Sequence, residues 1–98
     1  MNKLTETAAY HLWLLSIQKG PMQVDTLKIK YKNIRQQTLD ALTKNTYPKP
    51  LVRIRKGYYG RKDRVEITAA GRAKISTTIN NTRKWKRLNS DIFFRKVK

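Results

Sequence analysis

The stretch LVRIRKGYYGRKDRVEITAAGRA, residues 51–73, decides the fold. Its flanks, residues 51–55 and 64–68, alternate apolar and charged side chains, which is the pattern of half-buried β-strands. Between them lie two adjacent tyrosines bracketed by Gly57 and Gly60. Two alternating runs joined by a glycine-bearing loop predict a β-hairpin whose loop is longer than a tight turn and projects from the domain.

A helix is expected directly after this hairpin, over residues 69–88, with Thr68 as its N-cap. Gly71 in the first turn lowers helix propensity, so we expect a packing reason for it. Trp85 recurs at helical spacing with Leu88 and Ile92. The last ten residues fit a helix or a strand equally well, and the sequence leaves this open.

Three helices are expected before the hairpin. The first spans residues 5–19, with Thr5 as N-cap, and ends at Gly20-Pro21. His11 lies inside it as the only histidine, so it has no histidine partner for a metal or catalytic pair and is interpreted as structural. A short second helix is expected over residues 22–31.

The third helix is expected over residues 33–44, after a brief turn at Lys32-Asn33. Asn33 is a suitable N-cap, and Gln36 stands three residues later, which is the spacing of a capping box. The apolar residues of this segment fall on one face. Arg35, Gln36, Gln37, Asp40 and Lys44 are therefore expected to face solvent.

The net charge of the chain limits the class of molecule that can be its binding partner. The 98 residues have a formal net charge of +17, of which +5 falls in residues 1–50 and +12 in residues 51–98. Such a field concentrates anionic partners, so nucleic acid is the leading expectation. An anionic membrane is less favoured, because it would need a basic amphipathic helix where the second half shows a hairpin pattern. The absence of cysteine excludes disulfides and thiolate metal sites in this chain.

The order of these elements resembles a known superfamily. The stretch GPMQVDTLKIKYKNIRQQTLDALTK is similar to the helix-turn-helix half of winged-helix regulators, and LVRIRKGYYGRKDRVEITAAGRAKI resembles their wing and the following helix. The resemblance covers roughly residues 5–76. It implies an α+β winged helix-turn-helix fold, with three helices, a β-hairpin wing and a C-terminal helix. We expect a winged-helix domain at 1–76 and a basic C-terminal helix or tail at 77–98.

The turn departs from the superfamily pattern. Many such motifs have glycine between the two helices, whereas Lys32-Asn33 stands there in this chain. Asparagine tolerates left-handed backbone geometry, so the departure is mild.

The resemblance implies binding to double-stranded DNA, with the third helix in the major groove and the wing on flanking backbone or minor groove. Arginine pairs well with guanine and glutamine with adenine, and the N-terminal end of such a helix reaches base edges. The expected recognition-helix contacts are Asn33, Arg35, Gln36, Gln37 and Lys44. Their alternative interpretation is a solvated helix face with a capping glutamine.

The expected wing contacts are Arg53, Arg55, Lys56, Tyr58, Tyr59, Arg61, Lys62 and Arg64. Cations neutralise phosphates or enter a narrow minor groove, and tyrosine hydroxyls hydrogen-bond phosphate. In one alternative, one tyrosine packs back on the domain and only the other faces out. Arg53 and Arg64 either pair with Glu66 across the strands or flank DNA.

The expected tail contacts are Arg83, Lys84, Lys86 and Arg87. We interpret them as a second patch on the DNA backbone, and the alternative is an exposed, solvated helix end.

Several functions remain in competition at this point. A site-specific transcription regulator is favoured over an architectural DNA-bending factor for excision or replication initiation, and over an RNA- or single-strand-binding protein that stacks bases on exposed aromatics. An enzyme is not expected, because the six carboxylates form no clear pair. We expect no metal, cofactor, membrane or small-molecule ligand, and a cytoplasmic, nucleoid-associated location. Monomer and homodimer both remain open.

Overall fold

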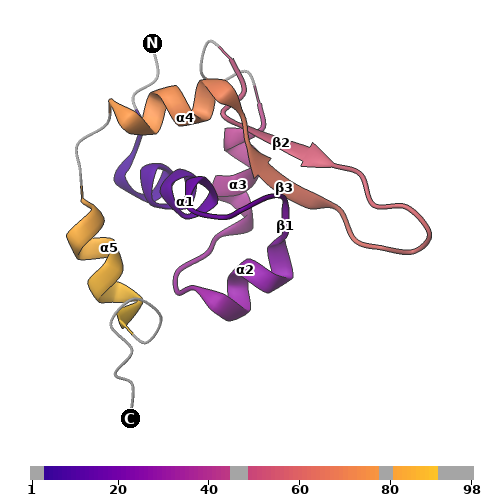
Figure 1. Cartoon of the computed structure of the whole chain (residues 1–98), viewed down its shortest axis with the longest axis horizontal. Helices are drawn as coiled ribbons and strands as arrows, with labels where there is room; N and C mark the ends of the chain where they lie inside the picture. The colour runs from indigo at the N-terminus through magenta and orange to yellow at the C-terminus, as the bar shows by residue number, and fades with distance from the viewer. Residues whose placement is uncertain (1–3, 45–48, 78–80, 91–98) are drawn as a thin grey trace.

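The computed structural model describes residues 4–44, 49–77 and 81–90. Within these ranges the chain is an α+β domain with five helices and one three-stranded antiparallel sheet. In chain order the elements are α1 (Glu6–Ser16), β1 (Met22–Gln23), α2 (Val24–Lys30), α3 (Gln36–Leu42), β2 (Val52–Arg55), β3 (Arg64–Ile67), α4 (Ala69–Ser76) and α5 (Thr82–Leu88). Figure 1 shows α1 at the centre of the helices, with the β2–β3 hairpin projecting away from them.

Helix α1 is buried along most of its length. The expected cap is confirmed, because Thr5 Oγ1 accepts from the Ala8 N–H at 3.1 Å. Every side chain from residue 8 to residue 15 is buried, and a helix that is buried on all sides belongs in the core. The helix ends at Ser16, short of the expected residue 19. There Ser16 Oγ donates to the Trp13 carbonyl at 2.6 Å, so a side chain satisfies one of the last carbonyls of the helix.

The second helix begins two residues later than expected. Met22 and Gln23 form a short strand, β1, which pairs antiparallel with Val65 and Arg64 of β3. This gives the strand order β1-β3-β2. The expectation of helix from residue 22 was wrong because pairing with a strand about 40 residues away overrides the local helical pattern.

The third helix also begins later than expected, at Gln36, and Asn33 is not its cap. Asn33 has a φ of 61°, in the left-handed region that asparagine tolerates. This turns the chain away from a helical path, and Arg35 takes the N-cap position without a side-chain cap bond. The expected capping box is therefore absent. Gln36 Nε2 instead donates to Asp40 Oδ1 at 2.8 Å.

The predicted hairpin is confirmed. Strands β2 and β3 pair antiparallel, from Val52 opposite Ile67 at the base to Arg55 opposite Arg64 at the outer end. Val52 and Val65 are buried against the helices, whereas Ile54 is 46% exposed. The outer part of the hairpin therefore extends beyond the helical layer and presents its loop to solvent (Figure 1).

The described residues between 69 and 88 form two helices, α4 and α5, rather than the one expected. Thr68 caps α4 as predicted, its Oγ1 accepting from the Gly71 N–H at 3.0 Å. At the other end, Ser76 Oγ donates to the Ala73 carbonyl at 2.8 Å and Thr77 Oγ1 donates to the Lys74 carbonyl at 3.0 Å. Hydroxyls that bond backward in this way compete with the backbone and favour helix ends.

Helix α5 packs on α1 through an aromatic cluster. The Trp85 and Trp13 rings lie 5.5 Å apart between centroids, and the Trp85 and Tyr10 rings lie 6.0 Å apart. Trp85 thereby joins the buried cluster formed by α1 and the sheet. Ile92, which shared its spacing in the sequence, lies outside the described residues.

In the parts of the chain that the structure describes, no helix combines the length and the apolar character needed to cross a membrane.

Gly71 has the packing role that its place in a helix suggested. A Cβ built there would lie 2.2 Å from the Leu51 carbonyl oxygen and 2.7 Å from Ile67 Cγ1. The Leu51 oxygen cannot move freely, because it accepts from the Thr68 N–H at 3.0 Å. The glycine thus allows α4 to approach the first residue of the hairpin.

We predict that Gly71→Ala destabilises the fold by about 2 kcal/mol, which is the upper end of the roughly 1–3 kcal/mol cost of overpacking less the roughly 1 kcal/mol that alanine gains in helix propensity. Urea unfolding would measure it. Gly20→Ala is the control: an added Cβ there meets no heavy atom within 4 Å, so we expect a change within about 0.5 kcal/mol. Equal stability of the two variants would contradict the packing role.

Candidate nucleic-acid interface

The turn between α2 and α3 is held by side chains from α1 and from the residue after α5. Tyr10 Oη donates to the Lys32 carbonyl at 2.6 Å. The Lys32 N–H donates to Asn89 Oδ1 at 2.9 Å, and the Arg35 N–H donates to His11 Nε2 at 2.8 Å. The backbone on both sides of the left-handed Asn33 is therefore fixed, although the turn has no glycine.

Helix α3 presents a polar, cationic surface from its N-terminal end. Leu39 and Leu42 are buried and anchor the helix on the core. Four of the residues expected to contact DNA here are exposed, as predicted: Arg35, Gln36, Gln37 and Lys44. Asn33, which was expected to cap the helix, is exposed as well. The turn fixes the backbone at Arg35, so the backbone positions from which these side chains extend are defined.

The hairpin loop, residues 56–63, has a tight turn at its tip. Tyr59 and Gly60 have φ values of 58° and 80°, and the Arg61 N–H donates to the Tyr58 carbonyl at 3.2 Å. Two central residues with positive φ match a type I′ turn, which suits the twist of a hairpin. Tyrosine is strained in this position, whereas Gly60 is not.

A hydrogen bond also closes the base of the loop. The Gly57 N–H donates to Asp63 Oδ1 at 2.8 Å. A Cβ at Gly57 would lie 2.0 Å from the Arg61 carbonyl oxygen, so only glycine allows the two sides of the loop to approach this closely. The loop therefore has a defined shape, although it projects.

Both tyrosines of the loop face solvent. Tyr58 is 71% exposed and Tyr59 is fully exposed. The alternative in which one of them packs back on the domain is therefore wrong: the type I′ turn directs both rings away from the core.

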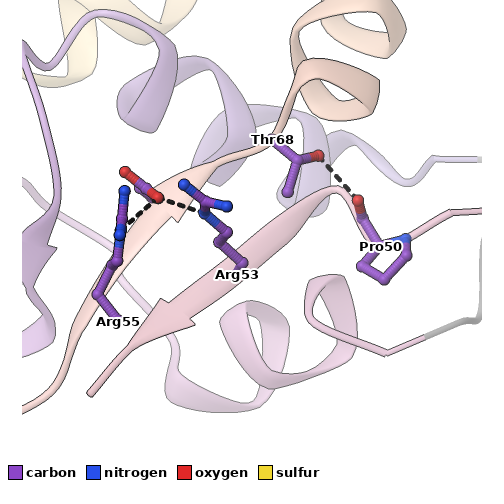
Figure 2. A network of polar contacts seen from close by, with 5 residues as sticks. Pro50, Arg53, Arg55 and Thr68 are labelled. Carbon is purple, nitrogen blue, oxygen red and sulfur yellow. Dashed lines mark hydrogen bonds and ion pairs between the residues drawn. The ribbon is translucent and has the colours of Figure 1, made fainter.

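Two arginines of the hairpin share one carboxylate. Arg53 Nε and Arg55 Nε both donate to Glu66 Oε1, the latter at 2.7 Å (Figure 2). Arg53 lies directly opposite Glu66, and Arg55 lies diagonally to it. Arg64, the other expected partner of Glu66, stands opposite Arg55 instead. Within the described part of the chain, Arg64 forms no ion pair, nor do Lys56 and Arg61.

The pKa of the Glu66 carboxyl reflects opposing effects. Partial burial of the group by itself raises its pKa. Hydrogen bonds from Arg53 and Arg55, together with their charges, outweigh this and hold the pKa below its usual value. Glu66 therefore stays ionised and reduces the repulsion between the two guanidinium groups.

An ion pair links the loop to α2. Lys62 Nζ donates to Asp25 Oδ2, and this bond and the lysine charge lower the pKa of Asp25. Both side chains are largely exposed, so the pair contributes little stability. It nevertheless places one cation of the loop against the first turn of α2.

The four basic residues of α5 lie in two different environments. Lys84 Nζ donates to Glu6 Oε1 at 2.6 Å and bridges α5 to α1. Lys84 and Arg87 also line a cavity of about 390 Å³ together with Arg35, and Trp85, Tyr10 and Leu88 form much of its wall. Arg83 and Lys86 do not line this cavity. The structure thus brings two of the four predicted tail contacts close to the start of α3.

Two residues of this site, Tyr10 and Asn89, were missed in the sequence, and His11 was interpreted as structural without its bond to the turn. Each is buried and bonds to the turn. A polar His11 in the middle of the run AAYHLWLL is a usable signal, because a buried polar group requires a partner. Its partner Arg35, 24 residues away, could not be identified from that signal.

In the described ranges, no group of three or more histidine or acidic residues is placed to hold a metal ion.

The chain matches no model of a known protein family, no curated protein and no solved structure.

We predict that Glu66→Gln weakens the hairpin by about 0.5–1 kcal/mol at low salt, because two half-exposed arginines lose their counter-charge. The difference should largely vanish in 1 M salt. Since folding lowers the Glu66 pKa, its contribution is present above about pH 4.5 and disappears as the pH falls through the folded value. Urea unfolding at two salt concentrations would measure this, and a difference unaffected by salt would contradict it.

Proposed function

We propose that the chain is a winged helix-turn-helix protein that binds specific sites in double-stranded DNA and regulates transcription. In this proposal α3 enters the major groove and the hairpin loop lies on the flanking backbone or minor groove. The protein acts by occupying its site, with no chemistry of its own, on the nucleoid of the cytoplasm.

The observation that carries the proposal is the N-terminal end of α3. Arg35, Gln36 and Gln37 are exposed there, on a helix whose start is fixed from the core. The major groove admits an α-helix, and the first residues of such a helix meet base edges. Arginine and glutamine are the side chains that form bidentate bonds with guanine and adenine.

The hairpin loop supports the same proposal. Lys56, Arg61 and Arg64 form no ion pairs with described residues, so their charges are available for phosphates. The closed turn at Tyr59-Gly60 holds them in a narrow projection. Phosphate contacts fix the register and orientation of a protein on the duplex, while base contacts read the sequence.

A second candidate is binding to single-stranded nucleic acid or RNA. The exposed rings of Tyr58 and Tyr59 favour it, because aromatic side chains beside cations stack unpaired bases. In that case α3 would contribute positive charge to binding without making sequence-specific contacts to base edges. An architectural role in bending DNA would likewise require α3 to bind without a preferred site.

Selection from a randomised duplex library, with single-stranded DNA and RNA as competitors and at several salt concentrations, separates these functions. A motif that survives rising salt supports the site-specific regulator, and its symmetry would report a dimer. Affinity that collapses with salt and selects no motif would contradict it and favour the architectural role. Capture by the single-stranded competitors would favour the second candidate.

We predict that Arg35→Ala relaxes the preference at one base pair by roughly 1–3 kcal/mol, because one side chain reads one base. The substitution keeps the backbone N–H that bonds His11, so the turn should remain intact. Lys19→Ala, an exposed lysine beyond α1, is the control and should leave the motif unchanged. A loss of affinity that is equal for all sequences would contradict the assignment of α3 as the reading helix.

We predict that Lys56→Ala weakens binding equally on all duplexes, because its expected contact is a phosphate. The slope of log K against log salt should become shallower by roughly 0.9, the value for one phosphate neutralised on duplex DNA. Titrations at four or more salt concentrations would measure it, with Lys19→Ala as the reference. An unchanged slope would remove Lys56 from the interface.

A further inference from the structure

The imidazole of His11 is buried between α1 and the start of α3. Its side chain is 1% exposed. Nδ1 lies 2.7 Å from the Thr7 carbonyl oxygen, and Nε2 lies 2.8 Å from the Arg35 amide nitrogen. A carbonyl can only accept and an amide N–H can only donate, so Nδ1 has the proton and Nε2 is the acceptor. The ring is therefore neutral in this arrangement.

This ring replaces the missing cap of α3. Arg35 is the N-cap residue, and no side chain of the helix itself bonds an amide there. In a capping box, a side chain in the first turn accepts from the N-cap N–H. His11 accepts that bond from another helix, so it couples the start of α3 to the core.

Protonation of the ring cannot keep this bond. A proton on Nε2 would face the Arg35 N–H, and two donors would then stand against each other. The resulting charge would also be buried, which is costly without a partner. The start of α3 therefore keeps its hydrogen bond to His11 only while the imidazole ring is neutral.

Among the described residues, the charged groups around the ring include no carboxylate that would compensate. Tyr10 meets it edge-on at 5.6 Å between centroids, and Arg35 is the cation whose field reaches it. The carboxylates on neighbouring elements are bonded elsewhere: Glu6 to Lys84, Asp40 to Gln36 and Glu66 to Arg53 and Arg55. On α4, Arg72 contacts the Ser16 carbonyl at 3.4 Å.

We propose that His11 is a positioning residue, whose neutral ring fixes the start of α3 and whose protonation releases it. The consequence for DNA rests on the proposed function: in acid, Arg35, Gln36 and Gln37 lose their fixed starting point and affinity falls. The coupling of His11 to α3 is a property of the free protein.

The direction of the pH effect follows from the surroundings of the ring. Burial lowers the pKa of His11 below its usual 6.5, the charge of Arg35 lowers it further, and the hydrogen bond to the Thr7 carbonyl acts in the opposite direction. The unfolded chain therefore binds the proton more readily than the folded one. The stabilisation is fully present above about pH 6.5 and declines as the pH falls below that value.

Three proteins test the proposal: the wild type, His11→Gln and His11→Leu. The amide oxygen of a glutamine can accept from the Arg35 N–H and does not titrate. A leucine fills the space but accepts nothing, so it leaves the amide unsatisfied. Because the chain has a single histidine, a side-chain titration between pH 5 and 8 points to this ring.

Amide hydrogen exchange followed by NMR is the first measurement, on the free protein at pH 7.5 and 5.5. At pH 7.5 the Arg35 amide should be protected in the wild type and H11Q, and exchange roughly threefold to tenfold faster in H11L. Towards pH 5.5 the wild type should begin to lose this protection, because the stabilisation declines below about pH 6.5, and H11Q should keep it. The Gly71 amide, capped by Thr68 Oγ1, is the internal control and should show no such difference.

Affinity for the selected duplex is the second measurement, at constant salt over the same pH range. We expect the wild type to lose affinity roughly threefold to tenfold towards pH 5.5 and H11Q to stay level. A wild type and an H11Q with the same exchange and the same pH profile would overturn the proposal, and this comparison remains valid if H11L does not fold. Failure to bind any duplex would reject the proposed function alone, because the exchange experiment needs no DNA.

Discussion

The domain depends on the burial of α1 at its centre. A chain of 98 residues with a net charge of +17 is subject to strong self-repulsion. Its core must offset that repulsion, and eight consecutive residues of α1 are buried in it. The sheet, α3 and α4 pack on this helix, and α5 adds Trp85 to it. The apolar centre leaves the cations of the hairpin and of α3 on the outside, where water screens them.

The sequence predicted the features that depend on neighbouring residues. The caps at Thr5 and Thr68, the hairpin and the need for glycine at position 71 each follow from local chemistry, and the structure contains all of them. The features that it did not predict are set by distant partners. Strand β1 exists because Met22 meets Val65, and α3 starts at Gln36 because Asn33 turns left-handed and Arg35 is bonded from α1.

The candidate site likewise combines features that the sequence predicts with features that depend on distant partners. Exposure of the α3 and hairpin cations could be predicted, because charged side chains seldom lie in a core. Of the ion pairs, only that of Arg53 with Glu66 was among the expectations, and the pairs between distant elements could not be predicted from spacing alone. Lys62 reaches Asp25 across 37 residues and Lys84 reaches Glu6 across 78, and such contacts follow only once the elements are packed. As a result, cations that look equivalent in the sequence differ in the structure: Arg53 and Arg55 share a carboxylate, whereas Lys56 and Arg61 have no such partner among the described residues.

The turn before α3 joins the core to the candidate site. Its backbone is bonded by Tyr10, His11 and Asn89, three buried side chains from opposite ends of the chain. A glycine in this turn would make the left-handed geometry easier and would also leave it more flexible. With asparagine at its centre and three bonds around it, the turn is rigid instead. In the proposed complex, that rigidity reduces the conformational entropy lost when α3 meets the groove. The same bonds make the orientation of α3 sensitive to the protonation of one buried ring.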